Sequence, residues 1–375
     1  MPPLRRGAIR AGPDGRGLPR RLCGRRRARH GFRLKNRQLG VRVSPAGGTL
    51  ARATSLKLLA LPAALVAAAL LAAAGSSRPV GFSYASPSWS PDGRQLVFLS
   101  ASGPRGAVLL AAANGKHLRR LVRASILSQV AWSPDGERIA FVTSGRVFVV
   151  GRSGRGRRLL GTGASVAWSP DSTRLAFDGG WIGPIQVAAL GSGSVEAVTT
   201  GSYDRAPSWS PDGKELVFTR SASAGGAESL YVVGADGEGL RPLGIQGADA
   251  SWSPGGDRIA FWRRTSDGVA LAVARLDQAG VVAITRSLPA YSGPARWSPD
   301  GSMLVFSPCS EFGNCRIDVA DRSGLEVTIL GPGNDPAWAP DGAHIAFAAR
   351  RFCPNSSIFT IRSDGSRLSR LTPCR

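Results

Sequence analysis

Short apolar runs of strand length recur along residues 84–372, and each run follows a polar turn. The runs are apolar at successive positions, as in RIAFV (138–142) and ELVF (215–218), instead of alternating polar with apolar residues. A short continuous apolar run bounded by turn residues is typical of a strand buried on both faces. The pattern therefore predicts many short buried strands.

Each run belongs to a repeat with a tryptophan, a Ser-Pro-Asp-Gly turn and a phenylalanine. The first strand ends at Trp, the second at Phe, and a third apolar strand and a short fourth strand follow. This order of turn residues favours a type I turn, and proline ends the first strand because it lacks an N–H. In three copies one turn residue is replaced, by Ser172, Gly255 or Ala339. The seven pairs are Trp89 and Phe98, Trp132 and Phe141, Trp168 and Phe177, Trp209 and Phe218, Trp252 and Phe261, Trp297 and Phe306, and Trp338 and Phe347.

The spacing of the tryptophans, 36 to 45 residues, is the period of a propeller blade. A blade in a ring has a neighbour on each side, so the repeated Trp and Phe are predicted to form the core between blades. We therefore expect an all-β fold: a seven-bladed β-propeller of four-stranded antiparallel blades over residues 84–375.

The motif W-S-P-D-G-x-x-[IL]-[AV]-F resembles the WD-like propeller repeat of TolB and its relatives, over about residues 84–372. TolB has six blades behind an α/β domain, whereas here seven repeats follow the apolar segment almost directly. The resemblance thus implies the fold and a general habit of binding proteins, and it does not transfer TolB's own role.

The segment before the repeats differs sharply in composition. Residues 1–57 hold 14 Arg and 2 Lys against one acid, Asp14, and are predicted to be a disordered basic leader. Residues 58–74 are apolar and predict one hydrophobic helix, either a signal-peptide core or a transmembrane anchor. Both alternatives place the repeats outside the cytoplasm, and contact with a membrane is expected only through this N-terminal segment.

The charge of the chain after the leader limits the classes of partner that we expect. Residues 58–375 carry 32 basic and 24 acidic side chains. Downstream of residue 80 the basic residues are scattered, and nucleic-acid binding needs them clustered among stacking aromatics. We expect no nucleic-acid partner; another envelope or surface protein, or a peptide, is expected, and a carbohydrate is an alternative.

Cysteine usage supports export. Four cysteines follow the leader, which allows three pairings. The order of strands that the resemblance implies predicts the disulfides Cys309–Cys315 and Cys353–Cys374, the second closing the last blade. There is no C-x-x-C motif and little histidine, so a zinc site is disfavoured and neither a metal nor a cofactor is expected.

The resemblance also implies which face is functional. If the strands of each blade run from the central channel outward, the connections between blades and the loops after the second strands share one face. Loops on a rigid scaffold carry function. Loop aromatics (Trp181, Trp262, Phe312 and Phe352) would suit a protein-binding rim. The predicted binding residues at the channel mouth are Tyr84, Gln129, Tyr203, Asp204, Arg205, Asp249, Tyr291, Asn334 and Asp335; the tyrosines there would either contact a ligand or plug the channel.

No catalytic constellation is found in the sequence. A G-x-S-x-G motif is absent, and none of the three histidines (His30, His117 and His344) is placed as a triad base. The prediction is a non-catalytic, exported protein-binding or scaffold module. The alternative is a channel-mouth enzyme, like a glycosidase, a lyase or a peptidase, that acts on carbohydrate or peptide with Asp204, Asp249 and Asp335 as its acids.

Overall fold

The computed structural model describes residues 83–102, 105–180, 182–277, 280–291, 293–310, 312–351 and 355–374. The chain divides into two units, Met1–Gly75 and Ser76–Arg375, and every described residue belongs to the second. The predicted leader (1–57) and apolar helix (58–74) therefore lie outside the described residues. Within the described part all regular structure is strand, and no helix there could cross a membrane.

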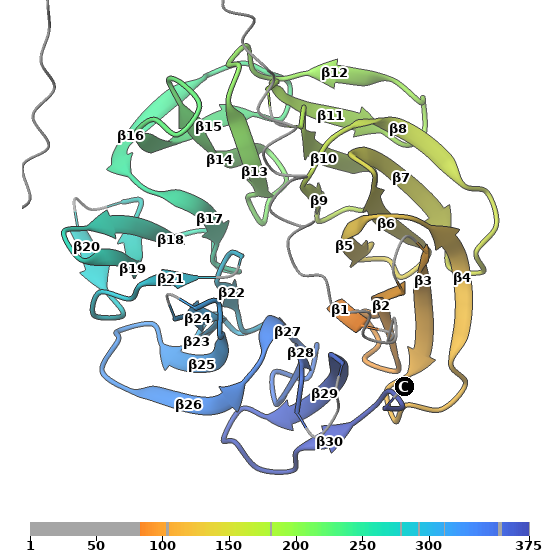
Figure 1. Cartoon of the computed structure of the whole chain (residues 1–375). Helices are drawn as coiled ribbons and strands as arrows, with labels where there is room; N and C mark the ends of the chain where they lie inside the picture. Colours follow the sequence, from red (N-terminus) through yellow and green to blue (C-terminus); the bar gives the residue numbers. More distant parts are fainter. Residues whose placement is uncertain are drawn as a thin grey trace, which may run out of the picture. The chain divides into compact units, whose positions relative to one another are not determined.

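Seven four-stranded antiparallel sheets form the fold, as predicted from the repeat. Six of them are built from four consecutive strands, and blade 6 uses β22, β23, β25 and β26, with β21 and β24 forming a small extra pair. In Figure 1 the sheets are arranged around a common centre, with the first strand of each blade innermost and the last outermost.

The strands of blades 1 to 3 are β1 (Ser83–Trp89), β2 (Gln95–Ser102), β3 (Arg105–Ala112), β4 (Arg119–Ala124), β5 (Leu127–Trp132), β6 (Arg138–Thr143), β7 (Arg146–Gly151), β8 (Arg158–Thr162), β9 (Val166–Trp168), β10 (Arg174–Asp178), β11 (Ile185–Ala189) and β12 (Val195–Ala197). Those of blades 4 and 5 are β13 (Asp204–Trp209), β14 (Glu215–Ser221), β15 (Glu228–Gly234), β16 (Arg241–Gln246), β17 (Ala248–Trp252), β18 (Arg258–Thr265), β19 (Gly268–Arg275) and β20 (Gly280–Ala283). Those of blades 6 and 7 are β21 (Ala290–Tyr291), β22 (Arg296–Trp297), β23 (Met303–Phe306), β24 (Pro308–Cys309), β25 (Arg316–Asp321), β26 (Val327–Pro332), β27 (Asn334–Trp338), β28 (His344–Ala349), β29 (Ser357–Arg362) and β30 (Ser369–Arg370).

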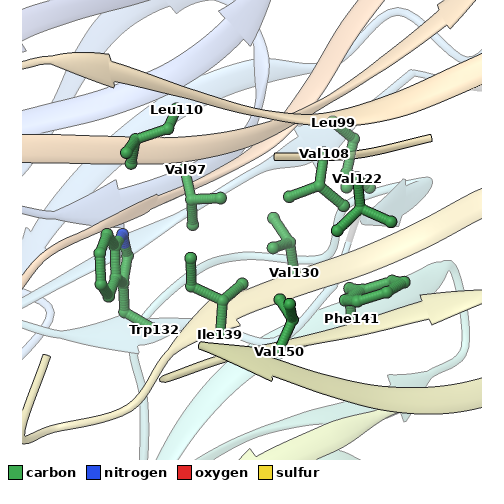
Figure 2. Close-up of a cluster of buried hydrophobic side chains, with 10 residues drawn as sticks. All are labelled: Val97, Leu99, Val108, Leu110, Val122, Val130, Trp132, Ile139, Phe141 and Val150. Carbon is green, nitrogen blue, oxygen red and sulfur yellow. The ribbon is translucent and has the colours of Figure 1, made fainter. Parts of the chain in front are cut away.

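The hydrophobic core lies between neighbouring sheets. Figure 2 shows one such layer, in which side chains of blade 1 meet Trp132, Ile139 and Phe141 of blade 2. The second strand of each blade is buried on both faces, which explains why its sequence does not alternate. All seven repeat phenylalanines are at most 1% exposed, so their predicted place in the core is confirmed.

The repeat tryptophans link neighbouring blades through hydrogen bonds. In five of the seven repeats the indole N–H donates to the carbonyl of the residue that precedes the tryptophan of the previous blade, whereas the N–H groups of Trp132 and Trp252 have no partner in the described structure. Trp209 bonds to Ala167 at 3.0 Å, and Trp297 bonds to Ser251 at 3.1 Å. Each bond satisfies a polar group that burial would otherwise leave unpaired, and it fixes the relative position of the two inner strands.

The Ser-Pro-Asp-Gly turns form a second set of links. Within a turn the serine hydroxyl donates to the aspartate, as from Ser90 Oγ to Asp92 Oδ1 at 2.6 Å, and this bond lowers the pKa of Asp92. Between turns, a Cβ at the glycine of one blade would lie within 4 Å of the proline of the previous blade, as for Gly136 and Pro91. We call the side of the ring that carries these turns the turn face.

The three altered turns keep their geometry by local substitutions. Ser172, at a φ of 61°, accepts a hydrogen bond from the Asp135 N–H of the previous blade at 2.9 Å. Asp257 replaces the missing aspartate of blade 5 and accepts from Ser253 at 3.2 Å. In blade 7, Asp341 pairs with His344 at 2.7 Å. The register of the repeat therefore survives each change.

The first and last blades close the ring through packing and hydrogen bonds, without exchanging a strand. The Tyr84 N–H donates to the Ser356 carbonyl at 3.0 Å, and the Trp89 indole donates to the Ala337 carbonyl at 3.2 Å. Gly93 and Pro340 repeat the contact between turns seen elsewhere. The seam between blades 7 and 1 thus repeats the indole hydrogen bond found at four other seams and the glycine–proline contact between turns.

Candidate functional site

The face opposite the turns carries the connections between blades, and we call it the connection face. There the inner strands contain β-bulges in blades 1, 4, 5 and 7. The residue three positions before the tryptophan has a positive φ in all four: 50° at Ser86, 52° at Ala206, 53° at Asp249 and 53° at Asp335. A bulge re-aims a side chain at the end of a strand, and aspartate tolerates this conformation better than most residues. Two predicted acids, Asp249 and Asp335, thus share one structural position.

Asp249 is the hub of a polar network that joins blades 4 and 5 to the start of blade 6. Its Oδ1 lies 3.5 Å from Arg205 Nη1, and its Oδ2 accepts a hydrogen bond from the Tyr291 hydroxyl at 2.7 Å. The other arm of the Arg205 guanidinium is paired with Glu228. Three predicted residues, Arg205, Asp249 and Tyr291, therefore meet.

The electrostatics of this network favour its ionised form. Burial alone would lower the pKa of Arg205, but the carboxylates of Asp249 and Glu228 outweigh it and raise that pKa. Burial, reinforced by the charge of Asp249, raises the pKa of Tyr291, so its hydroxyl stays protonated and can donate. The network is a fixed, hydrogen-bonded surface feature of the ring.

Asp335 joins blade 7 to blade 1. Its Oδ2 accepts the Ser86 N–H at 3.2 Å, and the Asn334 amide lies 3.5 Å away. Burial raises the pKa of Asp335, although the Ser86 hydrogen bonds and the charge of Arg296 oppose the rise. Asn334 and Asp335 are thus brought together as predicted neighbours, next to a residue that was not predicted.

That residue, Arg296, begins the innermost strand of blade 6. Its side chain is exposed to solvent, yet protein surrounds it closely enough that burial lowers its pKa, against the opposing charges of Asp335 and Asp249. Arginine keeps its charge at neutral pH despite such a shift. Neither a hydrogen bond nor an ion pair is found for its guanidinium in the described structure. Arg296 is therefore an unpaired cation between the carboxylates of blades 5 and 7.

The sequence contains a signal for Arg296 that the prediction of the site did not use. Arg296 occupies the position immediately before the tryptophan, where the other six blades carry only serine or alanine. Six blades carry a small side chain at this position and one carries a large charged side chain. Blade 6 therefore differs from the other blades at its innermost strand. The occupants in chain order are Ser88, Ala131, Ala167, Ser208, Ser251, Arg296 and Ala337.

Two predicted site residues lie in the core instead. Tyr84 and Asp204 stand five positions before their tryptophans and are almost completely buried. The Tyr84 ring packs edge-on against Phe98 at 5.7 Å. The same space is filled by a phenylalanine ring in blade 5, where a Cβ on Gly247 would lie 2.5 Å from Phe261. This position therefore faces the core, and placing Tyr84 at the channel mouth was wrong.

Asp204 is paired within its own blade. Arg220 holds both of its oxygens at 2.7 Å, and the Gly201 N–H donates to Oδ2 at 3.2 Å. A carboxylate bound on both oxygens in the interior stabilises blade 4 and is closed to a ligand. The expected convergence of Asp204 with Asp249 and Asp335 is replaced by this internal ion pair.

Gln129 and Tyr203, two further predicted site residues, contact the backbone of neighbouring blades. The Gln129 amide pairs with the Val166 backbone of the next blade, accepting at 2.9 Å and donating at 3.2 Å, so it braces two blades. Tyr203 is partly buried, and its backbone bridges Gly183 of blade 3. Their predicted binding roles remain predictions.

The predicted aromatic rim is only partly present. Trp262 is buried and stacks on Tyr291 with ring centroids 4.4 Å apart, so it supports the network from beneath. Phe312 is exposed, as expected. Trp181 and Phe352 lie outside the described residues.

The described structure bears on the predicted disulfides and on metal binding. Cys309 and Cys315 are joined in a disulfide, the first predicted pair. Cys374 is also disulfide-bonded, while Cys353, its predicted partner, lies outside the described residues. Within the described ranges no group of three or more His, Cys, Asp or Glu side chains is arranged to hold a metal ion.

The fold and the polar inner ends of its strands define a β-propeller of the WD-like class. A family model for the TolB beta propeller domain (PD40) matches residues 74–250 and 157–325. These matches cover more than half of the chain, so the chain belongs to the TolB β-propeller family.

Similarity to individual relatives is partial. The chain is 38% identical over 66 residues to the Tol-Pal system protein TolB of Rhizorhabdus wittichii, covering 17% of this chain and 15% of that protein. It is 30% identical over 177 residues to an uncharacterized protein of Agrobacterium fabrum, covering 44% of this chain and 57% of that protein. The chain thus spans less than two thirds of the length of either relative.

Solved structures with the same fold have diverse functions. An oligogalacturonate lyase in complex with manganese superposes with a TM-score of 0.62 at 14% identity, covering 74% of this chain and 90% of that chain. The propeller domain of the Trilobed protease from Pyrococcus furiosus gives 0.61 at 13% identity, covering 80% and 98%. TolB from Acinetobacter baumannii gives 0.50 at 18% identity, covering 70% and 74%. At these identities the likeness shows the fold alone.

Proposed function

We propose that this protein is a non-catalytic binding module outside the cytoplasm, which holds another protein or a peptide at its connection face. One observation carries the proposal: Arg296 presents an unpaired guanidinium at the inner end of blade 6, between fixed carboxylates. The guanidinium is free to pair with an incoming anion, and a carboxylate matches its planar shape with two hydrogen bonds. A carboxylate of the partner, from a side chain or a C-terminus, therefore pairs with Arg296.

Neighbouring groups support a peptide as the ligand. Tyr291, Asn334 and the rigid Asp249–Arg205 pair supply donors and acceptors around the guanidinium, and the exposed Phe312 supplies an apolar contact. Aromatic, arginine and tyrosine side chains are enriched in protein interfaces. The Cys309–Cys315 disulfide is typical of oxidising compartments, which supports a location outside the cytoplasm.

The test is a selection of peptides from a random library on the full-length protein, followed by calorimetric titration. We expect the selected peptides to share an acidic residue or to need a free C-terminus. Replacing that carboxylate by an amide, or Arg296→Ala in the protein, should each weaken binding by at least tenfold, since a charged hydrogen bond contributes about 1.5–3 kcal/mol. Lys214→Ala, an exposed lysine of the turn face, is the matched control and should bind as the wild type. Equal affinity for the acid and amide forms would refute the proposal.

A second candidate is an enzyme or lectin-like site for an acidic sugar. It is favoured by the fold likeness to oligogalacturonate lyase, because a uronate would present the same carboxylate to Arg296. Turnover of uronate-containing oligosaccharides that is abolished by Asp335→Asn and by Asp249→Asn, in variants that stay folded, would replace the first proposal by this one.

A further inference from the structure

Blades 1 and 2 are far more basic than the rest of the propeller. Residues 83–162 contain 12 Lys and Arg against 3 Asp and Glu, a net charge of +9, whereas residues 163–375 contain 19 against 21, a net of −2. The basic residues downstream of residue 80 were expected to be scattered. Grouping them by blade corrects that expectation, since most of the surplus positive charge lies in two adjacent sheets.

Eight of these twelve basic residues gather where the turn face meets the outer edge of the two blades. The hairpins between the third and fourth strands lie beside the Ser-Pro-Asp-Gly turns, as the Ala113 N–H bonded to the Arg94 carbonyl at 2.8 Å shows. Arg119 on the outermost strand β4 donates to the Arg152 carbonyl of blade 2 at 3.1 Å, so the surface is continuous across the blade boundary. We call this surface the basic rim; all its members are exposed: Arg94, Lys116, Arg119, Arg120, Arg152, Arg155, Arg157 and Arg158.

The positive charge of the basic rim is only partly compensated, because its eight cations face three acids of the adjacent turns, Asp92, Asp135 and Glu137. In the described part of blades 1 and 2, one ion pair occurs, Arg152 with Glu137 at 3.3 Å. The other described ion pairs lie in blades 4 to 7, where bases and acids are balanced. Clustered cations without partners create a local positive potential that attracts polyanions.

Two exposed leucines are neighbours of rim arginines in the chain, Leu118 just before β4 and Leu159 in β8. Leu118 is 39% exposed and precedes Arg119, and Leu159 is 49% exposed and follows Arg158. A surface of basic residues interleaved with exposed apolar side chains suits the interface of an anionic bilayer, where guanidinium groups meet phosphates and leucine enters the acyl boundary. A nucleic acid offers phosphates but no apolar phase for these leucines.

The chain outside the described residues agrees with a lipid surface. The apolar run 58–74 ends eight residues before Ser83, the first residue of blade 1, so the blades nearest to that run in the chain are the basic ones.

We propose that the basic rim binds an anionic phospholipid bilayer, through its cations and through Leu118 and Leu159. This interaction is separate from ligand binding at Arg296, and it adds a second membrane contact to the one expected of the N-terminal segment. It orients the propeller with the rim toward the membrane. Because each rim cation contributes roughly fivefold to the partition coefficient, the effect depends on the cluster and not on one residue.

The experiment is flotation of the full-length protein with vesicles of phosphatidylcholine alone or with about 30% anionic phosphatidylglycerol added. The test variant replaces by glutamine four rim residues whose side chains form no hydrogen bond or ion pair in the described structure: Arg94, Lys116, Arg120 and Arg155. The matched control makes the same charge change in the second half of the ring, where bases and acids are balanced, at Arg263, Arg264, Arg286 and Arg322, which are also exposed.

We expect the wild type and the control to partition at least tenfold better into the anionic vesicles than into the neutral ones in 0.1 M salt, and the rim variant to partition into the anionic vesicles at least tenfold less than the control. Since the basic leader and the apolar run are common to all three proteins, they cannot produce the difference between the two variants. The preference should also fall in 0.5 M salt, because screening shortens the range of the attraction. Equal losses in the rim variant and the control would overturn the proposal, and so would equal binding of all three proteins to both vesicles.

A second variant distinguishes binding to a lipid bilayer from binding to nucleic acid. Leu118→Ser combined with Leu159→Ser should weaken binding to anionic vesicles severalfold while leaving any binding to duplex DNA unchanged. A wild type that prefers duplex DNA to anionic vesicles, with no effect of the leucine changes on vesicle binding, would overturn the lipid assignment.

Discussion

Replacing the indole N–H of individual repeat tryptophans measures how much the bonds between blades stabilise the ring. Trp297 and Trp132 occupy the same structural position and are similarly buried, at 9% and 7% exposure. The Trp297 N–H donates to the Ser251 carbonyl at 3.1 Å, whereas the Trp132 N–H has no partner in the described structure. The two sites therefore form a natural pair for the substitution Trp→Phe.

The magnitude of the difference follows from this contrast. Both substitutions remove the same atoms and leave cavities of the same nominal size, so the packing losses cancel in the comparison. At Trp297 a hydrogen bond of about 1 kcal/mol is also lost, whereas at Trp132 the change removes an unpaired buried donor whose desolvation costs about 1–3 kcal/mol. We expect Trp297→Phe to be the more destabilising by about 2 kcal/mol.

Differential scanning calorimetry of the full-length variants checks this expectation. For domains of 150–250 residues, 1 kcal/mol corresponds to about 2–4 °C in Tm, and a gap of about 4 °C is expected here. Trp252, whose N–H is also unpaired, should behave like Trp132, and Trp209, which bonds to Ala167, should behave like Trp297. Losses that do not divide the four sites by their hydrogen bonds would refute the reasoning.

Three further predictions concern stability and covalent structure. Arg220→Met leaves the buried Asp204 carboxylate without its partner and should lower the unfolding free energy by about 3–5 kcal/mol, measured by urea denaturation; the additional change Asp204→Leu should recover much of the loss, and no recovery would contradict a paired charge. Hydrogen bonds from the adjacent turn lower the pKa of Asp300 to about 2, below its unfolded value, so its contribution is present above about pH 4 and is lost as the pH falls toward 2; Asp300→Asn should flatten the acid branch of a plot of Tm against pH, and an unchanged branch would count against this assignment. Non-reducing peptide mapping by mass spectrometry should find Cys353 linked to Cys374, and a different partner for either cysteine would reject the predicted closure of the last blade.

The fold could be predicted because each repeat carries the same physical causes. A tryptophan, a proline turn and a doubly buried strand each have a local cause, and Ser172, Gly255 and Ala339 show that single departures do not change the register. Seven copies of one pattern at a blade-like period left few architectures other than a closed ring.

The site was predicted only in part because the candidate residues were chosen by the loop in which they lie. Their position in the inner strand, counted back from the tryptophan, was not considered. Counting back from the tryptophan separates Tyr84 and Asp204, five positions away and buried, from Asp249 and Asp335, three positions away on bulges. Strand alternation alone does not give this result, because a bulge adds a residue and changes the face that follows. Arg296 was missed because the predicted site was built from the connections, while the distinctive position lies inside the strand.

Because each blade takes all its main strands from one continuous stretch of chain, no sheet depends on both ends of the polypeptide. A stretch of about forty residues could therefore be deleted or duplicated at the connections without leaving any sheet short of a strand, and the protein could be circularly permuted there. The number of blades is then set by how the blades pack around the axis of the ring and not by the order in which the chain connects them. The fold could therefore evolve, or be engineered, by duplication of whole blades.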